Sequence, residues 1–398
     1  MRLHHFFLWP LACLGTALGQ PSPAMPAPVQ RYSAAPEPWI LQKSGTAAGL
    51  RGIDSVDGTI AWASGAEGTV LKTIDGGAHW TQCAVPDRNG DGATLDFRGV
   101  QAWDATTAIV MASGPAEKSR LYKTVDACKT WTVLYANKDK QGFWDGFVFW
   151  DRQNGLILGD PTETRFYGDA DDQLNPLHLE FTMVFTADEG VTWSRQNYFA
   201  KSPFAVVGLQ DAAAFAASNS SLAVVGHTAW VATGGKNGAR ILLGDSYNVV
   251  PPSVLCDCSP MPPRTIWFTH SVAAPLAGGN ESSGIFSIHF RDQKLGAAVG
   301  GDYTKPNESA GTAAWSSDGG EHWTASATPP HGYRSTVQWS QSEKLWITAG
   351  TNGSDLSRDD GRTWQPLDTG NWNALSLPFI VGPKGRIARL NPAALPKP

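Results

Sequence analysis

The chain has 398 residues, a formal net charge of −5 and only 17% charged residues, while Gly (42 residues) and Trp (17) are abundant. This composition is typical of short strands joined by tight turns rather than of amphipathic helices. Nucleic-acid binding usually leaves a basic surface, so the acidic balance argues against a nucleic-acid partner.

The N-terminal segment predicts export. Arg2 precedes an apolar run over residues 6–18, and small residues follow at the positions expected for cleavage. This is the pattern of a secretory signal peptide over residues 1–19, and the run is too short to span a membrane. A lipoprotein signal ending at Cys13 is the alternative, which the preceding residues fit poorly. We expect residues 20–37, rich in Pro and Ala, to be a disordered leader, and the mature protein to be periplasmic or extracellular with no membrane span.

After the leader, the chain repeats one plan of four short β-rich segments, separated by Gly, Asp and Ser. Such segments predict antiparallel strands, and four in succession are the plan of a β-propeller blade. The expected starts of the first strands lie near residues 50, 97, 144, 211, 285, 333 and 373. The sequence therefore predicts an all-β fold, a seven-bladed β-propeller over residues 38–391, with a C-terminal tail over residues 392–398.

The last unit stops after three strands, at residues 385–390. We expect its fourth, outer strand to come from the N-terminus, where Trp39 begins the apolar segment 39–43. Closure of the ring in this way removes open sheet edges.

A motif of Ser or Thr, any residue, Asp, and then Trp five residues after the Asp marks five of the units. We call it the Asp–Trp motif. Its hydroxyl and carboxylate can accept backbone N–H groups at the hairpin between the third and fourth strands, and its Trp can bury a large surface. We therefore expect its aspartates to be structural rather than catalytic: Asp75, Asp126, Asp188, Asp318 and Asp359.

These motifs resemble the Asp-box, or BNR, repeats of sialidase-like propellers. The wider pattern, with residues 68–80 and Val-Gly-Gly-Asp at 299–302, resembles exported bacterial relatives of the photosystem II stability/assembly factor. The resemblance covers about residues 38–391. It implies the propeller fold but leaves function open, because such propellers include glycosidases, assembly factors and proteins of unknown role.

Ligands of propellers generally bind where the loops entering the first strands meet those between the second and third strands. Alignment of the units by their motifs places Arg51, Arg98 and Arg334 at one point, just before the first strand. Arginines there could hold a carboxylate or phosphate by paired donors, or each could pair with an Asp of a neighbouring blade. Tyr333 lies beside Arg334. Further candidates in the second-to-third-strand loops are Glu67, Asp160, Glu163, Arg165, Lys236, Arg240, Asp302, Tyr303 and Lys305.

Residues 87–92 carry oxygen ligands at alternating positions, Asp87, Asn89 and Asp91, followed by Gly92. This spacing matches the start of a Ca²⁺-binding loop. Arg98 stands where the loop would need its bidentate Glu, so a polar turn is the alternative to a structural Ca²⁺ site. No other cofactor motif is present.

The function that we expect is that of a non-catalytic binding or assembly scaffold, a monomer with a protein partner or an anionic glycan. The alternative is a glycoside hydrolase of sialidase-like type, in which Tyr333 would be the nucleophile. The Phe/Tyr-Arg-Ile-Pro motif of sialidases is absent around Arg51, and no Glu is obviously placed to activate Tyr333.

Export allows disulfides among Cys83, Cys128, Cys256 and Cys258. A bridge from Cys83 to Cys128 would join neighbouring repeats, whereas Cys256 and Cys258 could close a small ring or stay as thiols. The spacing decides none of these pairings.

Overall fold

The computed structural model describes residues 36–164, 178–195, 212–246 and 266–397. The predicted signal peptide, nearly all of the predicted leader, Arg165, Cys256 and Cys258 lie outside these ranges. The described residues form β-strands and three short 3-10 helices, η1 (Gly92–Thr94), η2 (Ala116–Lys118) and η4 (Pro392–Ala394). No helix within these ranges combines the length and apolarity needed to cross a membrane. The all-β prediction is confirmed.

Three four-stranded antiparallel sheets follow one another in the first half of the described chain. The first contains β2 (Leu50–Ser55), β3 (Ala61–Gly65), β4 (Val70–Thr73) and β5 (Thr81–Gln82). The second contains β6 (Phe97–Ala102), β7 (Ala108–Ala112), β8 (Arg120–Thr124) and β9 (Thr132–Ala136). The third contains β10 (Trp144–Phe149), β11 (Gly155–Thr164), β12 (His178–Thr186) and β13 (Ser194–Arg195).

A nine-stranded sheet comes next. Its first part contains β14 (Ala212–Ala213), β15 (Leu222–Val225), β16 (Thr228–Gly235), β17 (Arg240–Ser246) and β18 (Ile266–Ala273). Its second part contains β19 (Ser283–Phe290), β20 (Gly296–Asp302), β21 (Ala313–Ser316) and β22 (Thr324–Ala325). The two parts are joined by a single residue pair, Gly234 of β16 with Gly284 of β19.

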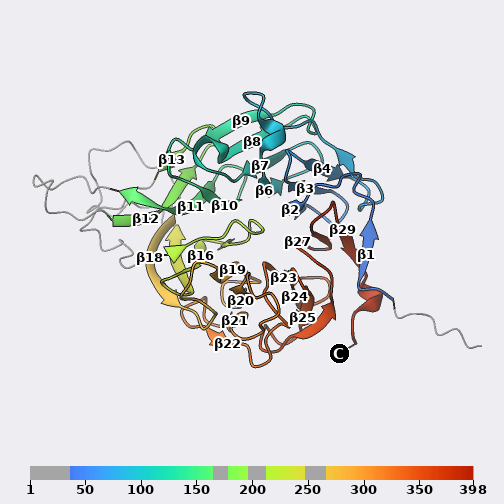
Figure 1. The fold of residues 1–398 in the computed structure, drawn as a ribbon, viewed down its shortest axis with the longest axis vertical. Coiled ribbons are helices and arrows are strands. Elements are labelled where there is room, and N and C mark those ends of the chain that lie inside the picture. Colours follow the sequence, from blue (N-terminus) through green and yellow to red (C-terminus); the bar gives the residue numbers. More distant parts are fainter. Residues whose placement is uncertain (1–35, 165–177, 196–211, 247–265, 398) are drawn as a thin grey trace, which may run out of the picture. The chain divides into compact units, whose positions relative to one another are not determined.

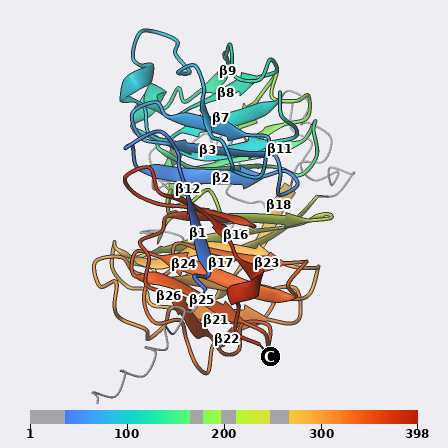
Figure 2. The same cartoon turned by 90° about the vertical axis from the view of Figure 1, so that its right-hand side faces the viewer.

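Two more four-stranded sheets complete the fold. One contains β23 (Thr336–Ser340), β24 (Leu345–Gly350), β25 (Gly353–Ser357) and β26 (Gln365–Asp368). The other contains β27 (Ala374–Ser376), β28 (Phe379–Val381), β29 (Ile387–Leu390) and, as its outer strand, β1 (Trp39–Gln42). The pairing of β1 with β29 is the predicted closure by an N-terminal strand (Figure 1), and Figure 2 shows β1 from the side.

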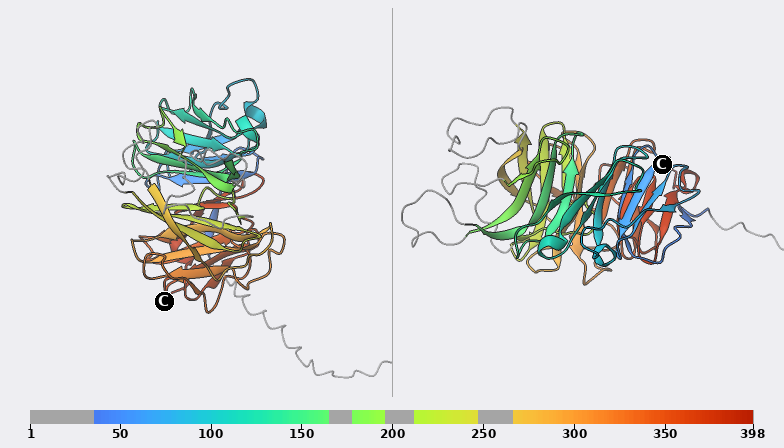
Figure 3. Two further views of the ribbon diagram at one scale, coloured as in Figure 1. Left: turned by 90° about the vertical axis from the view of Figure 1, so that its left-hand side faces the viewer. Right: turned by 90° about the horizontal axis from the view of Figure 1, so that it is seen from above.

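The sheets lie around a common centre, each with its first strand innermost (Figure 1). The inner strands contact one another in a closed cycle, in the order β2, β6, β10, β15, β19, β23, β27 and back to β2. Neighbouring sheets lie face to face when seen from above (Figure 3). The buried core is therefore divided among the spaces between sheets. In one such space, for example, Trp62 of β3 is buried with Phe97 of β6 and Tyr122 of β8. This is the architecture of a β-propeller.

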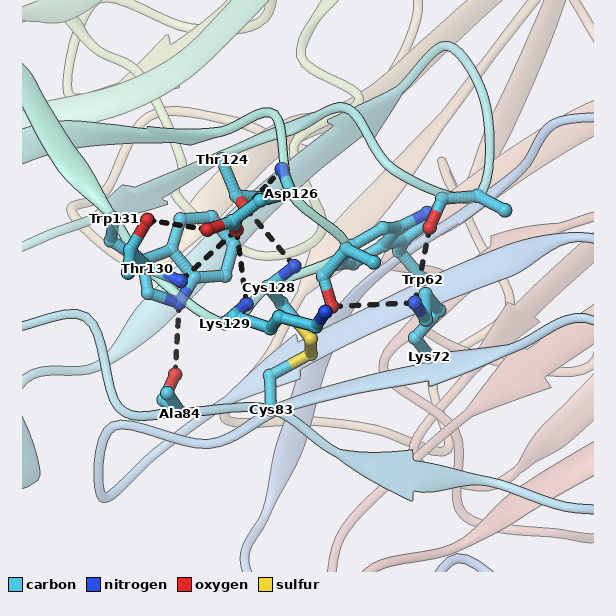
Figure 4. The surroundings of a disulfide bond; sticks show 12 residues. Trp62, Lys72, Cys83, Ala84, Thr124, Asp126, Cys128, Lys129, Thr130 and Trp131 are labelled. Atoms are coloured by element: carbon cyan, nitrogen blue, oxygen red, sulfur yellow. Dashed lines mark hydrogen bonds between the residues drawn. A yellow bond between two sulfur atoms is a disulfide. The ribbon is translucent and has the colours of Figure 1, made fainter.

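All five Asp–Trp motifs have the same local structure, shown for the second in Figure 4. There the Thr124 hydroxyl donates to Asp126 over 2.9 Å and accepts the N–H of Cys128 over 3.0 Å. The Asp126 carboxylate accepts both the N–H and the hydroxyl of Thr130. These bonds lower the pKa of Asp126 to about 2. The hydroxyl-to-carboxylate distance is 2.8–2.9 Å in every motif, so each aspartate is held within its own hairpin.

A disulfide joins Cys83, which follows β5, to Cys128 in the next sheet (Figure 4). Two polar contacts reinforce this junction. The Trp131 indole N–H donates to the carbonyl of Ala84 over 2.9 Å, and the Lys72 ammonium donates to the carbonyl of Ala127 over 3.3 Å. The bridge between neighbouring repeats, one of the pairings that the sequence left open, is therefore present, while Cys256 and Cys258 lie outside the described residues.

The segment before β15 crosses the centre of the ring. Asn219 accepts the N–H of Phe147 on β10 over 2.8 Å, while Ser218 donates to the carbonyl of Ser335, just before β23, over 2.7 Å. The Ser220 hydroxyl donates to Ser287 on β19 over 2.7 Å. These inner strands belong to three different sheets on opposite sides of the cycle. We call residues 214–221 the plug. Its residues 218–220 line a cavity on one side, and we call the end of the ring at Arg51 and Arg98 the mouth.

Candidate functional site

Arg51 and Arg98 occupy equivalent positions on the inner strands β2 and β6. Each is the extra residue of a β-bulge: Leu50 pairs with Gly65 and Gly52 with Ser64, which leaves Arg51 between the two pairs. Arg98 lies in the same way between Phe97 and Gly99. Bulges re-aim the side chain of the extra residue. Arg51 and Arg98 therefore occupy the same register position on neighbouring inner strands.

Arg334 does not lie at that position, which corrects the sequence alignment. Its backbone N–H donates to Gly300 O, as the N–H of Leu50 donates to Gly382 O. Arg334 thus corresponds to Leu50, one residue before Arg51, and Ser335 takes the rim position. Because a shift of one residue along a strand turns the side chain to the other face, Arg334 points into the core, where it is 0% exposed.

The buried Arg334 guanidinium is fully occupied by its own sheet. Its Nε donates to Asp355 Oδ2 over 2.7 Å, and Asp355 is also 0% exposed. Its Nη1 donates to the carbonyl of Tyr333 and to the Asn352 side chain, each over 2.6 Å. Arg334 therefore pairs with an aspartate of its own blade, and not with one of a neighbouring blade as the alternative expected.

Arg51 and Arg98 share one aspartate at the mouth. Arg98 Nε donates to Asp96 Oδ2 over 2.8 Å, and Arg51 Nε lies 3.6 Å from Asp96 Oδ1. Arg98 Nη1 also donates to the carbonyl of Ala216 in the plug over 3.2 Å. Within the described ranges, the Arg51 guanidinium donates no hydrogen bond, and its side chain is 38% exposed. Two positive charges against one carboxylate leave Arg51 able to bind a further anion.

Asp145 is a member of the mouth that the sequence reasoning missed. It is the bulge residue of β10, between the pairs Trp144–Gly159 and Gly146–Leu158, and so is equivalent to Arg51 and Arg98. A search for the residue before the first Gly of each inner strand would have found it. Asp145 is 2% exposed, and its Oδ2 has no hydrogen-bond partner among the described residues.

Asp160 lies next to Asp145, at the bulge within the neighbouring strand β11, and accepts the N–H of Ala214 in the plug. Burial raises the pKa of both carboxyl groups. The charge of Asp160 raises the pKa of Asp145 further, and the guanidinium of Arg98 opposes that rise. The Asp145 and Asp160 carboxyls and the Arg98 guanidinium therefore act on one another at the mouth.

A largely buried aromatic cluster lies near the mouth. Phe215 of the plug stacks on Phe286 with ring centroids 3.9 Å apart, and Tyr333 meets Phe286 edge-on at 4.8 Å. Burial and the neighbouring Tyr303 raise the pKa of Tyr333, and the charge of Arg51 opposes them. No carboxylate is among these influences.

The remaining predicted site residues serve local structure. Arg240 is tied to β18, donating to the hydroxyl of Ser271 over 2.9 Å and to its carbonyl over 3.2 Å. Asp302 ends β20 and accepts the hydroxyls of Ser282 and Thr304. The structure brings neither residue into contact with Arg51.

The predicted calcium ligands are also engaged within the protein. Asp87 accepts the N–H groups of Asn89 and Gly90 over 3.0 and 2.7 Å. Both oxygens of Asp91 accept hydrogen bonds from Arg120, over 3.2 and 2.6 Å. A cation at Asp91 would have to displace this guanidinium. In the part of the chain that the structure describes, His, Cys, Asp and Glu side chains form no group of three or more that could hold a metal.

A polar cavity of about 190 Å³ lies at the other side of the plug. Its side chains join neighbouring inner strands: Asp54 accepts the N–H of Ala102 over 2.7 Å, and Gln338 accepts that of Leu377 over 2.6 Å. Burial raises the pKa of Asp54 to about 6 and lowers that of His289 to about 4. These hydrogen bonds indicate that the side chains lining the cavity help to hold the ring together.

Solved structures similar to this chain are β-propellers. The structure titled YCF48 bound to D1 peptide is 15% identical, with a TM-score of 0.55 over 90% of this chain and 98% of that chain. YCF48 from Cyanidioschyzon merolae is 16% identical, with a TM-score of 0.52 over 89% of this chain and 98% of that chain. The chain is therefore a β-propeller that resembles YCF48, as the sequence resemblance implied for the fold.

A GH74 enzyme from Niastella koreensis is similar at a TM-score of only 0.33 and 15% identity, covering 83% of this chain and 53% of that chain. This likeness is too low to bear on function. No family model matches the chain, and no curated protein matches it. Identities this low show the fold, and function has to be argued from the site.

Proposed function

We propose that this chain is an exported, non-catalytic β-propeller that binds an anionic segment of a protein partner at the channel mouth. The observation that carries the proposal is the state of Arg51. Its Nε lies 3.6 Å from Oδ1 of Asp96, a carboxylate that Arg98 also contacts. Within the described ranges the Arg51 guanidinium donates no hydrogen bond, and it is partly exposed. A guanidinium presents a planar set of donors that matches a carboxylate, so an exposed one without hydrogen bonds is ready for such a ligand.

A peptide partner is favoured over an anionic glycan by the comparison. One of the similar propellers has a peptide bound, as its title states. The mouth described here also offers one charged side and one aromatic side, which suits an extended peptide with mixed side chains. The likeness to YCF48 and the sequence resemblance to photosystem II assembly-factor relatives both favour a scaffold over an enzyme.

We further propose that the ring has seven blades and that the protein acts as an exported monomer. The nine-stranded sheet then counts as two blades, because β16 and β19 share only the pair Gly234–Gly284. The disulfide between Cys83 and Cys128 supports export, since such bonds persist in oxidising compartments.

The glycosidase alternative receives no support from the site. A sialidase-like mechanism needs convergent arginines and a tyrosine activated by a carboxylate. Here Arg334 is buried against Asp355, and the influences on the pKa of Tyr333 include no carboxylate. Arg334 is therefore not one of a set of convergent arginines at the mouth.

The test is selection from a library of displayed random peptides with the mature protein immobilised. We expect enrichment of peptides that carry Asp or Glu, and loss of that enrichment with Arg51→Ala. The matched control is Arg152→Ala, which removes an exposed arginine from the β10–β11 hairpin at the opposite end of the inner strands. Equal enrichment by the Arg51→Ala variant, or none by the wild type, would refute the proposal.

A further inference from the structure

Tyr303 exposes an aromatic ring at the mouth. It is 52% exposed, and it is the only aromatic residue among the strongly exposed large hydrophobic residues of the described ranges. It follows β20 directly, in the loop between the second and third strands of its unit. Exposed aromatic rings that are well supported from below are common anchors of protein interfaces, because they bury a large area at little cost in side-chain entropy.

The backbone around Tyr303 is held firmly. The Asp302 carboxylate accepts the N–H of Thr304 over 3.0 Å and its hydroxyl over 2.6 Å, and the Asp302 carbonyl accepts the N–H of Lys305 over 2.9 Å. The N–H of Tyr303 itself donates to the carbonyl of Ser282 over 3.3 Å. The ring is therefore presented in a fixed place rather than on a free loop.

The ring of Tyr303 is connected to the charged side of the mouth through two further aromatic residues. It meets Phe286 edge-on, with centroids 6.1 Å apart and an interplanar angle of 83°. Phe286 is the bulge residue of β19, the position that Arg51 takes on β2. Tyr333 packs against Phe286 and lies within the electrostatic reach of both Tyr303 and Arg51. The exposed Tyr303 ring and the Arg51 guanidinium thus flank one buried aromatic cluster, formed by Phe286 and Tyr333.

We propose that Tyr303 is a specificity-determining residue for the partner segment, and that it binds an apolar side chain lying close in sequence to the carboxylate held by Arg51. This inference rests on the proposed function. The ligand class is a peptide that carries Asp or Glu beside an aromatic or large aliphatic residue. Arg51 supplies the attraction common to acidic peptides, and Tyr303 distinguishes among them.

The test uses short fluorescent peptides of Gly and Ser with a single Asp. In the first peptide a Phe is adjacent to the Asp, in the second the same Phe stands at the far end, and in the third Ser replaces the Phe. Binding to the wild type is measured by fluorescence anisotropy. We expect the first peptide to bind about tenfold more tightly than the other two, the gain typical of one added aromatic contact.

Two variants test whether the aromatic ring of Tyr303 causes this preference. Tyr303→Ser should bind all three peptides equally and still depend on Arg51, whereas Tyr303→Phe should retain the preference. Both substitutions are at an exposed side chain, and an unchanged thermal midpoint checks that the fold is intact. The inference is overturned if the wild type binds the three peptides equally, or if Tyr303→Ser keeps the preference. Failure of every peptide to bind, or binding unaffected by Arg51→Ala, would instead overturn the proposed function, and this inference with it.

Discussion

Arg334 and Asp355 form an ion pair in which both side chains are 0% exposed, with 2.7 Å between Nε and Oδ2. Burial lowers the pKa of Arg334, and the carboxylate of Asp355 acts against that shift. The Asp355 carboxylate also lies 2.7 Å from Nδ1 of His331. An arginine that the sequence placed on a binding rim is therefore part of the core of its sheet.

Removal of one member of this pair should destabilise the protein strongly. Asp355→Ala leaves a buried guanidinium without its counter-charge, for which we expect a loss of about 3–5 kcal/mol in the free energy of unfolding. Urea denaturation measures it. Arg51→Ala, at a half-exposed position, should cost less than about 1 kcal/mol. A similar stability of the two variants would show that the pair is not structural.

The plug can be tested at Asn219, whose side chain accepts the N–H of Phe147 over 2.8 Å and whose φ is 57°. Asn219→Gly keeps this left-handed backbone favourable and removes only the acceptor. We expect a loss of about 1–3 kcal/mol, because the Phe147 N–H is left without a partner. Amide hydrogen exchange at Phe147 should become faster. Unchanged exchange there would mean that Asn219 does not hold the plug to β10 in solution.

The disulfide should contribute to stability through the unfolded chain. Cys83 and Cys128 are 45 residues apart, and closing a loop of this size is worth about 4 kcal/mol in the chain-entropy model. A Cys83→Ser/Cys128→Ser variant should therefore unfold at a lower urea concentration, as should the reduced wild type. Reductant should not shift the midpoint of the double variant further. A further shift would place part of the effect on cysteines outside the described residues.

Asp54 should make stability depend on pH. Burial raises its pKa from 3.8 to about 6, so the folded state binds its proton more tightly than the unfolded state. The stability that the folded state gains from this tighter proton binding is present below about pH 4 and is lost as the pH rises through about 6. A fully buried carboxyl would give about 3 kcal/mol over this range. Asp54 borders the polar cavity and is only half-buried, so we expect about 1–2 kcal/mol.

Asp54→Asn tests this expectation, since an amide oxygen can still accept the N–H of Ala102. The variant should be more stable than the wild type at neutral pH, and their difference should shrink as the pH falls to about 4. Urea midpoints at a series of pH values measure this. Parallel pH profiles of the two proteins would exclude Asp54 as the source.

Calcium should have no effect on thermal stability. Both oxygens of Asp91 accept hydrogen bonds from Arg120, so a cation would have to displace a buried guanidinium. We expect the same melting temperature with excess Ca²⁺ and with a chelator. A melting temperature that rises when Ca²⁺ is added to the wild type, but not when it is added to the Asp87→Asn variant, would show that the loop binds the ion.

The repeated pattern in the sequence was enough to predict most of the fold. The Asp–Trp motifs marked the hairpins, and the unfinished last unit pointed to Trp39 for its outer strand, which is β1 paired with β29. Both features are local patterns with a fixed spacing, and such patterns are what a sequence reports directly. The site was less predictable. Register cannot be aligned to one residue across units of unequal length, and one residue separates the rim position from the core position of Arg334.

Two parts of the site left no local signal at all. Asp145 is equivalent to Arg51 but has a different charge, so a search for matching arginines passed over it. The plug follows no repeat pattern, and its place is set by hydrogen bonds from Asn219 and Ser218 to strands distant in sequence. Such long-range contacts become visible only in the folded chain.

The central claim is that Arg51 makes the channel mouth a binding site for an anionic peptide segment. The most direct measurement is the dissociation constant of one acidic peptide, selected by the wild type, for the wild type and for Arg51→Ala. We predict a loss of about tenfold or more, because a charge-assisted hydrogen-bonded pair is worth about 1.5–3 kcal/mol. An unchanged dissociation constant in a variant that is as stable as the wild type would contradict the claim.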